Sequence, residues 1–154
     1  MQTSRSTAQV SNNSSSAQSF DNFGSLTFNN ASTVSNVTIN NGGILSFNNT
    51  STAGNAALTN NGVSFFNGTS TAGNAAITNN GSITFAETSS AGNAAIINSG
   101  VGPTLVSFTD TSTAGSATIT TNNGAFTQFA ANSTGGNARF ITDTFGTVDF
   151  SGTS

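Results

Sequence analysis

The chain contains no histidine, cysteine, tryptophan or tyrosine, and it has a single proline. Charged residues make up 5% of its 154 positions. Acid–base, nucleophilic and metal chemistry draw mainly on histidine, cysteine, lysine and clustered carboxylates. We therefore expect a non-enzymatic protein that needs no cofactor and no metal ion.

Cations are almost absent, because Arg5 and Arg139 are the two positively charged side chains and the formal net charge is -3. Two cations are too few to neutralise the phosphates of a nucleic acid or to bind an anionic membrane surface. We therefore expect no nucleic-acid partner. Apolar runs are too short for a spanning helix, so membrane insertion is not expected either. Residues 1–19 lack the apolar core of a signal peptide, and we expect any export to use another route or a signal already removed.

What the chain does contain is a repeat. Residues 43–61, 62–80 and 81–99 are close to the pattern G-x-x-x-F-x-x-T-S-T-A-G-N-A-A-I-T-N-N, with a period of 19. A phenylalanine column recurs every 19 to 23 residues, at Phe28, Phe47, Phe66, Phe85, Phe108, Phe129 and Phe150. A second apolar column keeps the same register, at Ile39, Leu58, Ile77, Ile96, Ile119 and Phe140. Repeats of this length are typical of solenoids.

The spacing within one block indicates strands. Leu45 and Phe47 are separated by one residue, as are Ala56 and Leu58, which places each pair on one side of a strand. Asn-Asn-Gly and Thr-Ser-Thr-Ala-Gly sequences between the pairs are turn formers. The pattern predicts an all-β fold, a single-stranded parallel β-solenoid of six or seven coils with 19 to 23 residues each. We expect it to be right-handed, because 19 residues do not divide into the hexapeptides of left-handed forms.

This interpretation divides the chain into a polar tail or partial cap at residues 1–19 and a solenoid domain at residues 20–154. Equivalent residues of successive coils would lie about 4.8 Å apart, so both apolar columns are expected to form one continuous core. Two glycine columns, which include Gly54 and Gly62, are expected at turns with positive φ. A side-chain hydrogen-bond ladder is expected at the repeated bend, through Asn36, Asn55, Asn74, Asn93 and Asn137.

Two irregularities are expected to show in the structure. Four extra residues, 101–104, interrupt the period, and we predict a bulge or loop on one side because the register resumes afterwards. The last coil ends near Phe150 with no visible capping helix, which predicts an open edge able to recruit other strands.

The blocks Ser51–Gly62 and Ser70–Gly81, both S-T-A-G-N-A-A-[LI]-T-N-N-G, resemble the repeats in the passenger regions of large bacterial autotransporter adhesins. Their period is also similar to that of filamentous haemagglutinin-type secreted proteins. The resemblance implies a right-handed parallel β-helix, a place outside the cell or on the bacterial outer surface, and an adhesive, fibre or spacer role. It brings no catalytic residues. The expected partner is a host or abiotic surface, or the chain itself.

Three alternative functions stay open. Open solenoid edges would allow end-to-end stacking into a filament. Two rows of threonines resemble the ice-binding face of antifreeze solenoids, although we favour hydroxyls that satisfy backbone groups at a bend. These rows contain Thr50, Thr52, Thr69, Thr71, Thr111 and Thr113. Glu87 and Asp110 occupy equivalent positions in adjacent coils and could form a carboxylate pair of a polysaccharide-active enzyme, but no aromatic sugar platform accompanies them.

Overall fold

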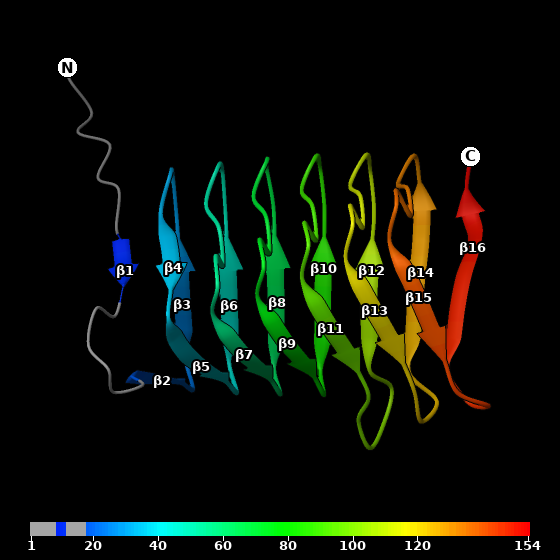
Figure 1. Cartoon of the computed structure of the whole chain (residues 1–154), viewed down its shortest axis with the longest axis horizontal. Coiled ribbons are helices and arrows are strands. Elements are labelled where there is room, and N and C mark those ends of the chain that lie inside the picture. The colour runs from blue at the N-terminus through cyan, green and yellow to red at the C-terminus, as the bar shows by residue number, and fades with distance from the viewer. Residues whose placement is uncertain (1–8, 12–17) are drawn as a thin grey trace.

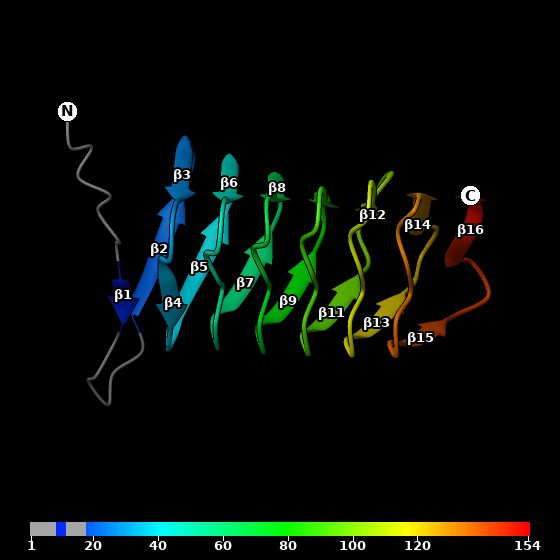
Figure 2. The same ribbon diagram turned by 90° about the horizontal axis from the view of Figure 1, so that it is seen from above.

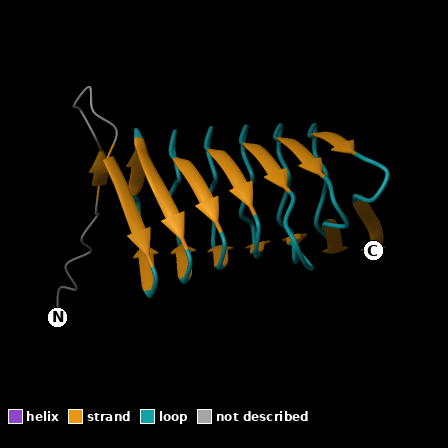
Figure 3. Cartoon of the chain, turned by 90° about the horizontal axis from the view of Figure 1, so that it is seen from below, coloured by secondary structure: helices purple, strands orange, loops and turns teal. Residues whose placement is uncertain are grey.

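The computed structural model describes residues 9–11 and 18–154, which contain strands and turns and no helix (Figure 3). The chain winds into coils that stand side by side along one axis, with residues 18–28 in the coil at one end and the C-terminus at the other (Figure 1). Within these residues no helix has the length and hydropathy needed to cross a membrane.

Two seven-stranded sheets form the main sides of the coils. The phenylalanine sheet contains β3 (Ser25–Phe28), β6 (Ile44–Phe47), β8 (Val63–Phe66), β10 (Ser82–Phe85), β12 (Leu105–Phe108), β14 (Phe126–Ala131) and β16 (Thr147–Thr153). The isoleucine sheet contains β2 (Gln18–Asn22), β5 (Val37–Asn41), β7 (Ala57–Asn60), β9 (Ala76–Asn79), β11 (Ala95–Asn98), β13 (Thr118–Thr121) and β15 (Arg139–Thr142). The strands of the isoleucine sheet run obliquely across the rod when it is seen from above (Figure 2).

A third, narrower side closes each coil. Here β1 (Gln9–Ser11) pairs with β4 (Thr33–Ser35), and a row of single-residue parallel bridges, called the bridge row below, continues to the other end. The bridge row contains Thr33, Thr52, Thr71, Ser90, Thr113 and Thr134. All pairings are parallel and join neighbouring coils, which confirms the predicted all-β parallel solenoid of about seven coils.

The register pairs like residues with like. Phe66 lies opposite Phe47 and Phe85, and Ile77 lies opposite Leu58 and Ile96. From Phe28 to Phe129 the successive rings stack with centroids 4.6 to 5.0 Å apart, and their planes are nearly parallel. This spacing follows from the distance between paired strands, so the backbone ladder itself sets the ring stack.

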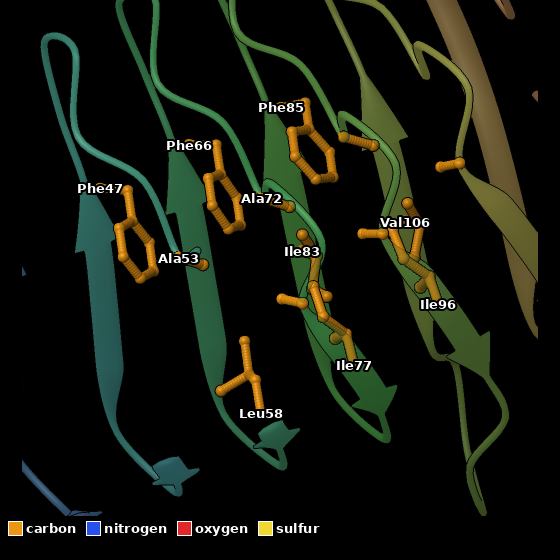
Figure 4. Close-up of a cluster of buried hydrophobic side chains, with 14 of the residues drawn as sticks. Phe47, Ala53, Leu58, Phe66, Ala72, Ile77, Ile83, Phe85, Ile96 and Val106 are labelled. Atoms are coloured by element: carbon orange, nitrogen blue, oxygen red, sulfur yellow. The ribbon is translucent and has the colours of Figure 1, made fainter. Parts of the chain in front are cut away.

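The core runs through the inside of the coils (Figure 4). Phe47, Phe66 and Phe85 are fully buried, and the small residues Ala53 and Ala72 face them from the third side. Burial of each phenylalanine contributes roughly 1.5 to 3 kcal/mol. Because one coil cannot enclose these rings by itself, neighbouring coils stabilise one another.

The core column does not stay buried at the last coil. Phe150 stacks on Phe129 with centroids 4.3 Å apart, yet 42% of its surface is exposed. Phe140 packs edge-on against both rings and is only partly buried. The expectation of a buried core position for Phe150 is therefore corrected. Among the described residues, β16 has a neighbouring strand on one side only, so the Phe150 ring is covered by Phe129 and stays open on its other side.

The two glycine columns turn out to need glycine for different reasons. Gly54 has a φ of 57°, as expected of a turn glycine. In the column of Gly62, Gly124 alone has a positive φ, 77°, so the expectation is corrected for Gly62 and the other members of that column. A Cβ atom on Gly62 would collide with the carbonyl oxygen of Gly43 in the preceding coil. Close approach of two backbones excludes a side chain there.

The interruption at residues 101–104 is a loop between β11 and β12 that extends beyond the neighbouring corners (Figure 1). Val101 is fully exposed at its tip, and the register resumes at once with Leu105 opposite Ser82. The predicted one-sided loop is confirmed. Of the predicted tail, β1 and the start of β2 belong to strands, and residues 1–8 and 12–17 lie outside the described residues.

Candidate functional site

Most of the described surface carries no formal charge. No charged residue occurs between Asn22 and Ala86, a stretch that winds through several coils. The outer surface there presents hydroxyl, amide and methyl groups together with a few apolar side chains, among them Phe23 and Ile44. Any contact that this surface makes must depend on hydrogen bonds and packing rather than on ion pairs.

The predicted threonine rows lie on the third side of the coils. Thr50, Thr69 and Thr111 are exposed, whereas Thr52, Thr71 and Thr113 are partly exposed in the bridge row. Their hydroxyls bond the chain's own backbone: Thr69 Oγ1 donates to the carbonyl of Asn49 at 3.1 Å, and Thr71 Oγ1 accepts from the N–H of Gly73 at 3.0 Å. The other four make the same two kinds of bond. This arrangement agrees with hydroxyls that satisfy backbone groups at a bend.

The predicted asparagine ladder forms in part, at the surface. The Nδ2 group of Asn74 donates to Oδ1 of Asn55, and that of Asn93 donates to Oδ1 of Asn74, both at 3.2 Å. All three side chains are exposed. In the described residues the ladder extends from Asn55 to Asn93, and Asn36 and Asn137 lie outside this run, with Ser116 interrupting the row before Asn137.

A second asparagine ladder, which the sequence interpretation missed, lies inside the coils and is buried except at its first member, Asn22. Its members are Asn22, Asn41, Asn60, Asn79 and Asn98, each linked to the next by an Nδ2 to Oδ1 bond of 2.7 to 2.8 Å. Each asparagine follows an inward side chain by two residues, as Asn60 follows Leu58. The alternation of a strand therefore placed these amides inside, and that signal was available in the sequence.

The buried ladder also satisfies backbone groups at the corner between the two sheets. Asn60 Nδ2 donates to the carbonyl of Ser82 at 2.9 Å, and Ser64 Oγ donates to Asn60 Oδ1 at 2.8 Å. At the C-terminal end Asn98 Nδ2 bonds the Phe126 carbonyl at 2.7 Å, and the Thr121 and Thr127 hydroxyls replace the amides. These polar groups hold neighbouring coils together where the chain turns.

The paired carboxylates are exposed turn residues. Glu87 and Asp110 have φ values of 58° and 56°, and their side chains accept backbone N–H groups of the preceding coil. Glu87 Oε2 accepts from Gly68 at 2.8 Å, and Asp110 Oδ2 accepts from the N–H of Glu87 at 2.9 Å. Both groups thus stabilise a strained turn. Among the described residues no group of three potential ligands is placed to hold a metal ion.

Two further carboxylates cap turns of the last coil. The N–H of Phe145 donates to Asp143 at 3.0 Å, and together with the N–H groups of Asn123 and Gly146 it holds the pKa of Asp143 below its ordinary value. The backbone and hydroxyl of Ser151 lower the pKa of Asp149 in the same way.

Comparison with known proteins finds no matching family model, no similar curated protein and no similar solved structure. The resemblance to adhesin repeats therefore rests on the repeated blocks alone and stays a prediction. The structure identifies a parallel β-solenoid of about seven coils, and many of its polar side chains bond its own backbone.

Proposed function

We propose that the chain is a non-enzymatic structural rod, a fibre or spacer segment with an adhesive surface, placed outside the cell or on a bacterial outer surface. The observation that carries this proposal is the unbroken stack of phenylalanine rings from Phe28 to Phe129. Such a stack fixes a constant rise per coil, so the length of the rod is proportional to the number of repeats.

The polar groups support the same role. Threonine hydroxyls, asparagine amides and the Glu87 and Asp110 carboxylates are used in bonds within and between coils. If these side chains took part in catalysis, they would have to give up the hydrogen bonds that keep the coils in register. The proposed work of these side chains is to maintain a regular surface.

That surface indicates the kind of target. Without charges between Asn22 and Ala86, an adhesive face would favour uncharged materials such as neutral polysaccharide or an abiotic apolar surface. Adhesion by hydrogen bonds and packing is little affected by salt, whereas adhesion by charge weakens as salt is added.

The test uses beads coated with the purified chain and a panel of surfaces: cellulose, polystyrene and an anion exchanger. We expect adhesion to the uncharged surfaces that is equal at low and high salt. Three variants locate the adhesive face, because each places one carboxylate on a different side: Thr69→Glu on the third side, Thr78→Glu on the isoleucine sheet and Thr84→Glu on the phenylalanine sheet. One of them should weaken adhesion while the other two serve as its controls.

Two assays on the same material test the alternatives. Release of reducing ends from a polysaccharide, abolished by Glu87→Gln, would overturn the non-enzymatic proposal. Thermal hysteresis that is lost in Thr69→Glu would favour an ice-binding surface instead.

A further inference from the structure

Aromatic side chains are exposed at both end coils, and Phe126 of β14 is the one further exposed phenylalanine among the described residues. Eight large apolar side chains of the described residues are exposed to solvent, and four of these are phenylalanines of the end coils. Phe20 and Phe23 of the first coil are 40% and 85% exposed, and Phe145 and Phe150 of the last coil are 72% and 42% exposed. Such end-located aromatic surface indicates an interaction at the ends of the rod.

The edges carrying these residues have the geometry of a strand-pairing surface. In the described residues β15 and β16 end their sheets and pair on one side only, and so do β2 and β3 at the opposite end. Their free sides present backbone N–H and C=O groups in the parallel spacing used by every other coil. An edge of this kind pairs readily with another strand.

We propose that two copies of the chain dock head to tail, with β15 and β16 of one copy paired to β2 and β3 of the next. The observed register can be continued by one step. It places Phe150 on Phe28 of the second copy, Val148 on Leu26, and Phe140 on Phe20. These three inward contacts at the junction each join two apolar side chains, and the same register places Thr142 on Asn22, the first member of the inner amide ladder.

The exposed corner residues also match. Phe23 directly precedes Gly24, and Phe145 directly precedes Gly146, at the same corner of their coils. The inner coils have no exposed aromatic at this corner, where Gly42, Asn61 and Asn80 occupy the position. In the docked pair Phe145 contacts Phe23 of the second copy, which explains why an aromatic side chain occurs at both ends.

Charge complementarity fixes the direction of docking. Arg139, the one cation among the described residues, is exposed on the outer face of β15. Asp21 is exposed on the outer face of β2, beside Asn40. In the continued register these two residues are diagonal neighbours on one face, a separation of roughly 7 to 8 Å that an arginine side chain spans. A head-to-tail contact that repeats along the axis of the rod does not close into a ring, so it produces filaments rather than dimers.

The first test is sedimentation and negative-stain electron microscopy of the purified 154-residue chain over a range of concentrations. We expect rods that grow longer, and not wider, as the concentration rises. A monomer at every concentration up to about 1 mM would overturn the proposal. This result would leave the proposed adhesive role intact, because adhesion is measured on single immobilised chains.

Matched variants test the junction itself. Phe145→Ser should weaken association by about tenfold or more, whereas Phe126→Ser, at a 47% exposed side chain on β14 one coil away from the junction, should leave it unchanged. Arg139→Glu and Asp21→Arg should each weaken association, and the double variant should restore it. Circular dichroism checks that each variant is folded. Association that depends on Phe126 and not on Phe145, or a charge swap that restores nothing, would overturn the head-to-tail contact.

Discussion

At the scale of single residues, the interior combines stacked rings with one row of stacked amides. Phe66 is fully buried between two parallel rings, whereas its neighbour Phe65 points outward and is partly exposed. The two positions thus offer an internal comparison of the same side chain on the two faces of one strand.

Phe66→Ala should lower the free energy of unfolding by about 3 to 5 kcal/mol, because it removes buried surface and leaves a cavity in the ring stack. Phe65→Ala should lower it by about 1 kcal/mol or less. Chemical denaturation of both variants measures the difference. Equal effects would show that the assignment of inner and outer faces is wrong.

The buried amide row gives a second comparison. Asn60→Ala removes the partner of Asn41 Nδ2 and of Asn79 Oδ1, and it should destabilise the protein by about 2 to 4 kcal/mol. Asn74→Ala interrupts the exposed ladder, where water replaces the lost bonds, and should change stability by less than about 0.5 kcal/mol. Thermal melts of the pair decide whether burial makes the difference.

Buried serines beside the rings behave differently from one another. The Ser70 hydroxyl is buried without a hydrogen-bond partner, whereas that of Ser112 donates to the Phe85 carbonyl at 3.1 Å. Ser70→Ala should therefore leave stability unchanged or raise it by up to about 1 kcal/mol, and Ser112→Ala should lower it by about 0.5 to 1.5 kcal/mol. The reverse order in denaturation midpoints would contradict this account.

These residues show what the sequence could and could not predict. The phenylalanine and isoleucine columns were predictable, because repeat period and strand alternation agree at each position. The Asn60 row was missed since asparagine is usually read as a turn former. The positive φ of Glu87 and Asp110 had a signal as well: Asn49 and Gly68, which favour this conformation, stand in the same column. Exposure of Phe150 depends on its place in the last coil and not on local sequence.

At the scale of elements, the loop at residues 99–104 is an addition to a complete coil. Leu105 N bonds the carbonyl of Gly81 in the preceding coil, just as Val63 N bonds that of Gly43. The tip of the loop takes no part in these backbone hydrogen bonds between coils. At the base of the loop, the Thr104 hydroxyl is buried without a hydrogen-bond partner.

Deletion of residues 101–104 should therefore be tolerated. It would join Gly100 to Leu105 and restore the sequence spacing found around Val63, with a shorter loop to close. We expect a cooperatively folded protein whose stability is within about 1 kcal/mol of the parent. Loss of cooperative unfolding in a thermal scan would show that the loop is needed for the register. Deletion of 82–85, which removes β10, is the control expected to disrupt the fold.

At the scale of the whole molecule, the composition makes stability nearly independent of pH around neutrality. No histidine, cysteine or tyrosine is present to titrate there. The carboxylates with lowered pKa, Asp143 and Asp149, contribute stability only in their charged forms. Their contribution is present above the ordinary value of 3.8 and is lost as the pH falls through the lower pKa of the folded state.

The melting temperature should accordingly be constant from about pH 5 to about pH 9 and should fall below about pH 4. Asp143→Asn should reduce the fall in acid, because the variant has no carboxylate to protonate. Differential scanning calorimetry at several pH values measures this. A transition near neutral pH would contradict the assignment.

Backbone hydrogen bonds join each coil to the next one along the rod, as those from Val63 to Gly43 and from Ser82 to Gly62 do. Tension applied to the two ends therefore pulls directly on these bonds and opens the coils one after another instead of shearing a whole sheet. Each opened coil frees a segment of 19 to 23 residues, which adds roughly 60 to 80 Å to the length of the chain when it is fully extended. A surface protein built in this way would lengthen in steps under flow, and each step would absorb mechanical work before the attachment itself failed.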